Sequence, residues 1–440
     1  MEVLDTVVIG AGIAGLSAAH QLIKGGFKTC ILEANAEPGG RVRTLVDNGY
    51  RMDLGFQVFL TAYPEAIRQL DYSKLDFCAF QSGAMVRHGN GFTRISDPFR
   101  DPTALVSTLM SDVAPLGDKI KIAYLRQKLM NTSVDEIFRR PEKSIHDALL
   151  NDYGFSPKII DRFFRPFFGG ITLDASLSGS ARMFDFVFKM MSEGNVAIPR
   201  LGMGEISKQL AAKLPAETIR FNSRVSNIEP DRTSFEGQNV LTVVMADNSK
   251  ILARSVVIAT EGTEAGRLCP SIEKPKTRTV NCLYFSHDIV PSTEPLLFLN
   301  GNLESENSGG GVVNNLAILT NCSPALAPRD KHLYSVTVLE EGESPESLEK
   351  GVRKQLISWF GQEYDKLEHL KTMKIERALP DQSPPWLDMP RKAIKIDDAG
   401  RTLYVCGDHR DNASINGAMV SGRRAAEQIL KDLKVTVSLA

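Results

Sequence analysis

The sequence of 440 residues has few cysteines, no surplus of basic charge and no long apolar run, and each absence excludes a class of protein. The six cysteines are scattered and never form a C-x-x-C pair, so we expect neither a disulfide framework nor a metal site. Lysine and arginine number 52 against 53 aspartate and glutamate residues, which gives a net charge of −1. Because a nucleic-acid binder needs a basic surplus to neutralise phosphates, we expect no nucleic-acid partner.

The N-terminus carries a short apolar run from Val7 to Leu16 that does not have the features of a targeting segment. The acidic residues Glu2 and Asp5 stand where a secretory signal would have basic residues. Elsewhere no stretch reaches the roughly 18 uninterrupted apolar residues of a membrane-spanning helix. We therefore expect a cytoplasmic protein with no signal peptide and no transmembrane helix.

What the chain does contain is the opening of a dinucleotide-binding unit. A predicted strand leads into Gly10, Gly12 and Gly15, and a helix is predicted from Leu16 to Lys24. The first glycine permits a tight turn, the second lets backbone N–H groups approach a pyrophosphate, and the third lets helix and strand pack closely. Glu33 stands at the end of the next predicted strand, where a carboxylate accepts hydrogen bonds from a ribose hydroxyl.

Two further motifs carry groups suited to the rest of such a ligand. A Gly-Gly-Arg turn at residues 39–41 supplies an arginine that can pair with the pyrophosphate or shield it. Near the C-terminus, Gly407 and Asp408 follow a predicted strand, and the carboxylate can accept a hydrogen bond from a sugar-alcohol hydroxyl. A helix predicted to begin near Gly417 would point its positive end at the same place.

These motifs resemble those of the flavin-containing amine oxidase superfamily, which includes phytoene desaturases, protoporphyrinogen oxidases and the flavin-free Rab GDP-dissociation inhibitors. The resemblance covers residues 1–60 and 401–440, together with the predicted strand near Val225. It implies that the chain binds FAD. The residues that the resemblance and the motifs assign to FAD are Gly10, Gly12, Ala14, Gly15, Glu33, Gly39, Gly40, Arg41, Gly55, Gln57, Val225, Gly407, Asp408, Gly417 and Ala418.

The implied fold is α/β, with a Rossmann-like FAD-binding domain of the glutathione-reductase type and a second α+β substrate domain formed by two insertions. The predicted FAD-binding domain takes residues 1–65, 195–262 and 398–440. The predicted substrate domain takes residues 66–194 and 263–397.

A concentration of phenylalanines at residues 163–168 and 184–188 is the sequence feature that bears on the substrate class. These aromatic side chains form either an ordinary helical core or the wall of a long apolar tunnel. The first stretch resembles phytoene-desaturase-like proteins, which implies an FAD-dependent dehydrogenase or desaturase. Such an enzyme takes hydride onto flavin N5 from a small apolar substrate, here an isoprenoid or polyene. Asn281, Tyr284 and Trp386 are the implied pocket residues, and the sequence names no catalytic acid or base.

Two alternatives stay open. The first is amine or protoporphyrinogen oxidation in the same superfamily, although amine oxidases often carry a lysine on the strand where Asn281 stands. The second is a flavin-free prenyl-binding protein like the Rab GDP-dissociation inhibitors. The sequence decides neither the electron acceptor, oxygen or a quinone, nor the oligomeric state. Lys119, Lys121, Arg126 and Lys128 form either a solvated helix face or a basic patch in peripheral contact with a membrane.

Overall fold

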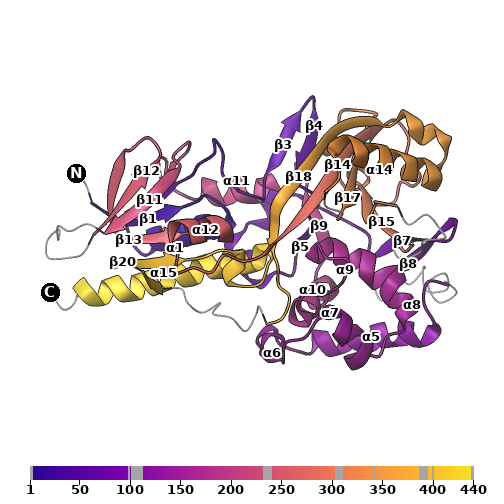
Figure 1. The fold of residues 1–440 in the computed structure, drawn as a ribbon, viewed down its shortest axis with the longest axis horizontal. Helices are drawn as coiled ribbons and strands as arrows, with labels where there is room; N and C mark the ends of the chain where they lie inside the picture. Colours follow the sequence, from indigo (N-terminus) through magenta and orange to yellow (C-terminus); the bar gives the residue numbers. More distant parts are fainter. Residues whose placement is uncertain are drawn as a thin grey trace.

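The computed structural model describes residues 3–97, 100, 112–230, 240–302, 311–339, 342–385, 395–398 and 401–437. The chain forms two main sheets and a group of helices (Figure 1). The first sheet has eight strands in the order β10-β2-β1-β13-β12-β11, with β20 paired to β13 and β19 paired to β20. Its strands are β1 (Val3–Ile9), β2 (Thr29–Leu32), β10 (Ile219–Arg220), β11 (Val225–Pro230), β12 (Leu241–Met245), β13 (Lys250–Ile258), β19 (Lys395–Asp398) and β20 (Arg401–Val405).

The centre of this sheet is parallel and is covered on both faces. β1 pairs in parallel with β2 and β13, and β13 pairs in parallel with β20. Val8 packs in one apolar cluster with residues of α1 (Ile13–Lys24) and α15 (Ile415–Val437), whereas Val7 and Ile9 pack in another with α12 (Gly262–Leu268). Two buried faces explain why the strand reads as an unbroken apolar run and not as an alternating one.

The second sheet has seven strands in the order β18-β14-β17-β16-β15-β7-β8 and lies at the opposite end of the molecule from the two chain termini (Figure 1). One face is covered by α14 (Pro345–Phe360), which packs on alternate residues of β14 and β17. The strands are β7 (Gly83–His88), β8 (Gly91–Ser96), β14 (Thr277–His287), β15 (Leu297–Asn300), β16 (Asn315–Ile318), β17 (His332–Val338) and β18 (Glu368–Pro380).

A helical insertion lies beside the second sheet (Figure 1). Its helices are α5 (Leu116–Met130), α6 (Val134–Arg139), α7 (Ile145–Asp147), α8 (Pro157–Ile159), α9 (Arg165–Thr172) and α10 (Ala181–Glu193), with π-helical turns at 148–152 and 160–164. Serine side chains cap three of them, because Ser133, Ser144 and Ser180 each accept a bond from a first-turn N–H. The phenylalanines singled out in the sequence form the core here. Phe164, Phe168, Phe184 and Phe186 are each at most 1% exposed.

Short elements connect these parts. They are β3 (Thr44–Asp47), β4 (Tyr50–Asp53), β5 (Phe59–Leu60), β6 (Phe77–Ala79), β9 (Val196–Pro199), α2 (Pro64–Gln69), α3 (Tyr72–Leu75), α11 (Gly204–Ala212) and α13 (Leu319–Cys322). Among the described helices, none is both long and apolar enough to cross a bilayer.

The fold class predicted from the sequence is confirmed: a Rossmann-like sheet with helices on both faces is joined to a second α+β part. The strands of the first sheet fall within the three predicted FAD segments, except that β19 begins three residues before the predicted boundary at 398. The strands of the second sheet come from the two predicted insertions. The division into two domains is consistent with these sheets and stays a prediction.

Candidate functional site

The glycine turn after β1 leads into the N-terminal end of α1 and leaves the position beside Gly12 unfilled by side chains. Gly10 has a φ of +105°, and a Cβ there would lie 3.0 Å from the carbonyl oxygen of Ala259. A Cβ at Gly15 would overlap the carbonyl oxygen of Gly10. A Cβ at Gly12, the N-cap residue of α1, would meet no described atom within 4 Å, and no described side chain caps this helix end. The N–H groups at the positive end of α1 are therefore available to a phosphate.

A second glycine turn closes over the first. The Gly39 N–H donates to the carbonyl of Ala11 at 2.8 Å, and a Cβ on Gly40 would lie 3.7 Å from the Cα of Gly12. Glu33 is buried, and its Oε2 accepts a bond from the Ala11 N–H at 2.8 Å. The structure thus brings together the first glycine turn, the second and the acid, as the sequence pattern indicated.

The strand predicted to touch the adenine end starts next to the same acid. The Ser223 N–H donates to the carbonyl of Glu33 at 2.7 Å, and β11 begins two residues later at Val225. Val225 itself is buried, and its carbonyl accepts a bond from Arg267 at 3.0 Å. Its contact with FAD stays a prediction.

The most informative contact joins the two ends of the chain. Arg41 Nη2 donates to Asp408 Oδ1 at 2.7 Å across 367 positions of sequence, and Arg41 Nη1 donates to the carbonyl of Ala378 at 2.9 Å. Burial acts to raise the pKa of Asp408, but the charge and hydrogen bond of Arg41 outweigh it and hold that pKa below its ordinary value. Gln57 supports the arginine, since its Nε2 donates to the Arg41 carbonyl at 2.9 Å. Gly55, two residues before it, has a φ of +83°.

The start of α15 is the other wall of this site. A Cβ at Gly417 would overlap the carbonyl oxygen of Asn412, and the Gly417 N–H donates to Ser414 Oγ at 3.0 Å. Ala418 follows in the first turn and is partly buried. One turn further, a Cβ at Gly422 would overlap the carbonyl oxygen of Ala14, so α1 and α15 cross with their backbones almost in contact.

Sequence reasoning missed His409, which has the least satisfied side chain at the site. The residue is 5% exposed, and within the described residues neither ring nitrogen has a hydrogen-bond partner. A Cβ on Gly407 would lie 2.5 Å from the imidazole, and one on Gly262 would lie 3.2 Å from it, so the ring is closely held. Burial lowers the pKa of His409 to about 4. Its only signal in the sequence was its place directly after Asp408.

This donor set fits FAD. The buried imidazole of His409 has no partner among the described residues, and it follows directly on Asp408, whose buried carboxylate pairs with the partly exposed Arg41. These groups are suited to the polar and anionic parts of the cofactor. The positive end of α1 and the open space at Gly12 suit a pyrophosphate, and Glu33 suits a ribose.

The predicted pocket residues are not brought together. Tyr284 is fully buried on the β14 face that is directed at the β4 region, where its hydroxyl donates to the carbonyl of Asp53 at 2.9 Å. Asn281 lies on the opposite face, because it differs from Tyr284 by an odd number of positions on the strand. Trp386 lies outside the described residues.

The comparison with known proteins assigns the site to a family. Residues 13–430 match the family model described as flavin containing amine oxidoreductase. The chain belongs to that family of flavin-dependent oxidoreductases. FAD is therefore its cofactor. That the residues described above hold it stays a prediction, which their geometry fits. The flavin-free alternative is not retained.

Individual relatives match more weakly. Protoporphyrinogen oxidase 2 of Arabidopsis thaliana is 27% identical over 166 residues, which cover 37% of this chain and 31% of that protein. Hydroxysqualene dehydroxylase of Zymomonas mobilis is 25% identical over 285 residues, 61% of this chain and 65% of that protein. The chain thus spans less than two thirds of the length of either relative. A crystal structure of an oxidoreductase from Methanosarcina mazei has a TM-score of 0.72 at 19% identity, covering 96% of this chain and 100% of that one.

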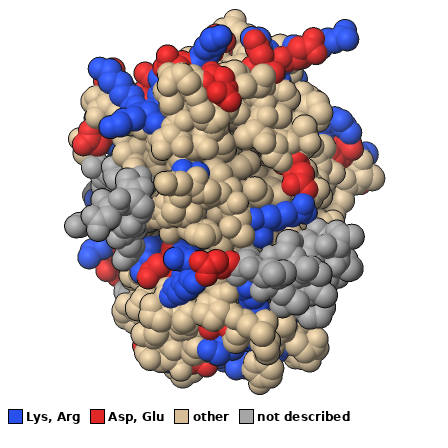
Figure 2. Space-filling view, turned by 90° about the vertical axis from the view of Figure 1, so that its right-hand side faces the viewer, with Lys and Arg blue, Asp and Glu red and all other residues tan. Residues whose placement is uncertain are grey.

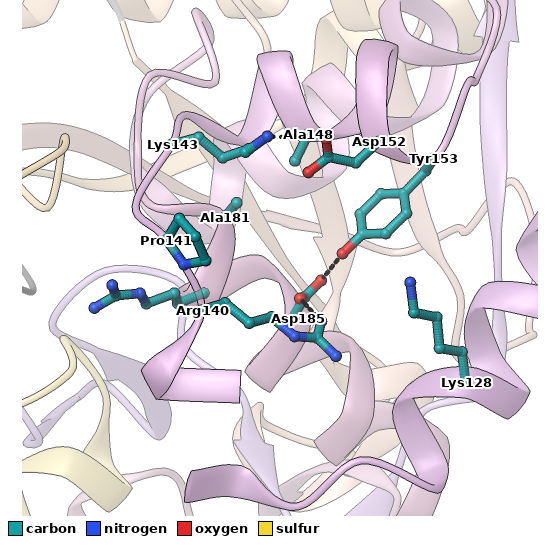
Figure 3. Close-up of a pocket in the computed structure, with 10 residues that line it drawn as sticks. Lys128, Arg140, Pro141, Lys143, Ala148, Asp152, Tyr153, Ala181 and Asp185 are labelled. Atoms are coloured by element: carbon teal, nitrogen blue, oxygen red, sulfur yellow. Dashed lines mark hydrogen bonds and ion pairs between the residues drawn. The ribbon is translucent and has the colours of Figure 1, made fainter. Parts of the chain in front are cut away.

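A separate cavity of about 360 Å³ lies in the helical insertion (Figure 3). Its charged side chains interact with one another: Asp185 accepts bonds from Arg140 and from the Tyr153 hydroxyl, each at 2.5 Å, and Lys143 donates to Asp152 at 2.8 Å. Because these charges already pair across the cavity, we assign no ligand to it. Among the described residues no three histidine, cysteine, aspartate or glutamate side chains gather as metal ligands.

Proposed function

We propose that the chain is an FAD-dependent dehydrogenase or desaturase that acts on an uncharged, apolar substrate of the isoprenoid or polyene class. When bound, FAD supplies the acceptor for the hydride, at its N5 atom. The chain's own residues then have to hold a substrate C–H bond against the cofactor and keep water away.

The observation that carries this proposal is the apolar surrounding of residues 54–57, the segment that supports Arg41. Leu54 and Phe56 are partly buried against the large core cluster, and the ring of Phe80 lies 6.5 Å from that of Phe56. The Ile375 side chain approaches to 3.4 Å of where a Gly55 Cβ would stand. Apolar side chains of this kind would stabilise an apolar substrate in contact with them by removing its surface from water.

Two polar side chains of β14, Cys282 and Tyr284, are held neutral. Burial raises the pKa of Cys282 to about 11. Burial also raises the pKa of Tyr284 well above its ordinary value, and its hydroxyl proton is bound to the Asp53 carbonyl. A cationic amine would meet no carboxylate from these β14 side chains, whereas a hydrocarbon needs none.

The relatives support the same substrate class without deciding it. Hydroxysqualene, from which one relative takes its name, is a squalene derivative and hence an isoprenoid. Protoporphyrinogen oxidation is the second candidate, because the match to the Arabidopsis protein includes 37% of this chain.

The test is turnover by the purified flavoprotein with three substrate groups: isoprenoids and polyenes, protoporphyrinogen, and primary and secondary amines. Products are identified by mass spectrometry, with oxygen or a soluble quinone supplied in turn as electron acceptor. We expect dehydrogenated or otherwise oxidised isoprenoid products. Oxidation of protoporphyrinogen alone would favour the second candidate, and oxidation of amines alone would exclude both.

A further inference from the structure

Helix α5 has an apolar stripe on its solvent side. Leu116, Ile120 and Tyr124 are 57%, 62% and 70% exposed, and their spacing of four residues places them on one side of the helix. Leu125 and Leu129 are buried on the other side and attach the helix to the core. A soluble surface helix ordinarily presents polar residues to water, so the second apolar stripe needs its own explanation.

The charges around the stripe are mainly positive. α5 carries four basic residues, Lys119, Lys121, Arg126 and Lys128, and one acidic residue, Asp118. Two of the basic side chains are themselves in ion pairs, Lys121 with Asp118 at 3.2 Å and Arg126 with Asp97 at 3.6 Å. Asp118 is buried and is bound by Lys121 and by Ser156, so it does not add a negative charge to the surface.

The acidic residue that precedes the helix is likewise compensated. Asp112 is exposed, but it forms ion pairs with Lys158 at 2.7 Å and with Arg162 at 3.7 Å. The stripe is therefore bordered by more basic than acidic side chains, and the acids named here are all buried or paired.

The helix is also placed where a flat surface could reach it. Figure 1 shows α5 along the outer edge of the helical insertion. Figure 2 views this end of the molecule, where charged side chains of both signs stand in groups between broad uncharged areas.

We propose that α5 is a membrane-docking helix, which lies in the headgroup region of an anionic phospholipid bilayer and inserts Leu116, Ile120 and Tyr124. The apolar side chains leave water, the aromatic ring takes the polar boundary that tyrosine favours, and the flanking lysines meet anionic headgroups. This contact does not depend on which substrate the enzyme oxidises, and it can be tested without turnover.

The test is co-sedimentation of the flavin-loaded protein with large vesicles of phosphatidylcholine, alone or mixed with phosphatidylserine. The variant replaces all three stripe residues, Leu116→Ser, Ile120→Ser and Tyr124→Ser. The matched control replaces three other exposed apolar residues, Val46→Ser, Ile67→Ser and Ile289→Ser, which are 54%, 59% and 43% exposed on other elements. Thermal unfolding and flavin content verify that both variants are folded.

We expect the native protein to bind the anionic vesicles and to bind less as salt is added. The stripe variant should lose affinity by roughly tenfold to a hundredfold, and the control variant should not change. Equal binding by all three proteins, or no binding by the native protein, would overturn the proposal. So would a native dimer in solution that the stripe variant converts to a monomer, because the stripe would then be an interface between copies.

Discussion

The unpartnered imidazole of His409 allows a prediction in which stability and cofactor affinity move in opposite directions. The ring is buried with neither nitrogen bonded to a described residue, and an unsatisfied buried polar group costs about 1–3 kcal/mol. His409→Leu removes that polar group while filling similar space. We expect the unfolding free energy of the flavin-free variant to equal that of the native protein or to exceed it by up to about 2 kcal/mol.

With FAD bound, the same substitution should be costly. A hydrogen bond to a charged or strongly polar ligand group contributes about 1.5–3 kcal/mol, which corresponds to a rise of roughly 10- to 150-fold in the Kd for FAD. Flavin fluorescence titration of the flavin-free protein measures the Kd, and urea unfolding with and without FAD measures the two stabilities. His409→Asn, which keeps a donor, should recover part of the affinity.

His287→Leu is the matched control. His287 is also buried, but its Nε2 bonds to the carbonyl of Glu363 and its Nδ1 accepts from the Ile289 N–H, both at 3.1 Å. Its substitution should lower stability and leave the FAD affinity unchanged. If His409→Leu behaves in the same way, losing stability while binding FAD as tightly as the native protein, the reasoning is wrong.

Three further predictions concern the same site. Gly12→Ala should change the unfolding free energy of the flavin-free protein by no more than about 0.5 kcal/mol, because no described atom lies within 4 Å of the added Cβ, but it should weaken FAD binding. Gly15→Ala should instead unfold the turn, because its Cβ would overlap the carbonyl oxygen of Gly10. Circular dichroism together with flavin titration separates the two outcomes. Arg41→Met should lower the unfolding free energy by roughly 2–4 kcal/mol in denaturant titrations, because it leaves Asp408 buried without its cation. Burial raises the pKa of Asp53 from 3.8 to about 7, so between these pH values the folded protein keeps a proton that the unfolded chain releases. This proton stabilises the folded state at low pH. Its contribution should be lost as pH rises from about 4 through 7, and Asp53→Asn should abolish that part of the pH dependence.

The pH dependence at His409 has the opposite sign. Its pKa is lowered from 6.5 to about 4, so the unfolded chain takes up a proton that the folded chain refuses. The flavin-free protein should therefore lose stability as pH falls from about 6.5 toward 4, by at most about 3 kcal/mol from this group. His409→Leu should show a shallower loss in urea unfolding measured at several pH values; an unchanged slope would contradict the assignment.

The cofactor turns were predictable because their requirements are local. A glycine at position 10 is needed for a φ of +105°, and Gly15 is needed because a side chain there would overlap the preceding turn. The helix starts were misplaced by a few residues: α1 begins at Ile13, three residues before the predicted Leu16, because the last glycine lies inside its first turn, and α15 begins at Ile415 instead of near Gly417.

What could not be predicted depends on contacts between distant parts of the chain. The pairing of Arg41 with Asp408 spans 367 positions, and no local pattern brings them together. The isolation of His409 follows from the glycines packed around it and not from its neighbours in sequence. By contrast, the separation of Asn281 from Tyr284 was foreseeable, since strand residues three apart face opposite sides.

The most direct test of the substrate class is reduction of the bound flavin without oxygen. The flavoprotein is mixed anaerobically with an isoprenoid or polyene and, separately, with a primary amine, and the visible absorbance of oxidised flavin is followed. We expect the isoprenoid to bleach that absorbance and the amine to leave it unchanged. Bleaching by the amine, with no response to any isoprenoid, would contradict an enzyme built for an uncharged, apolar substrate.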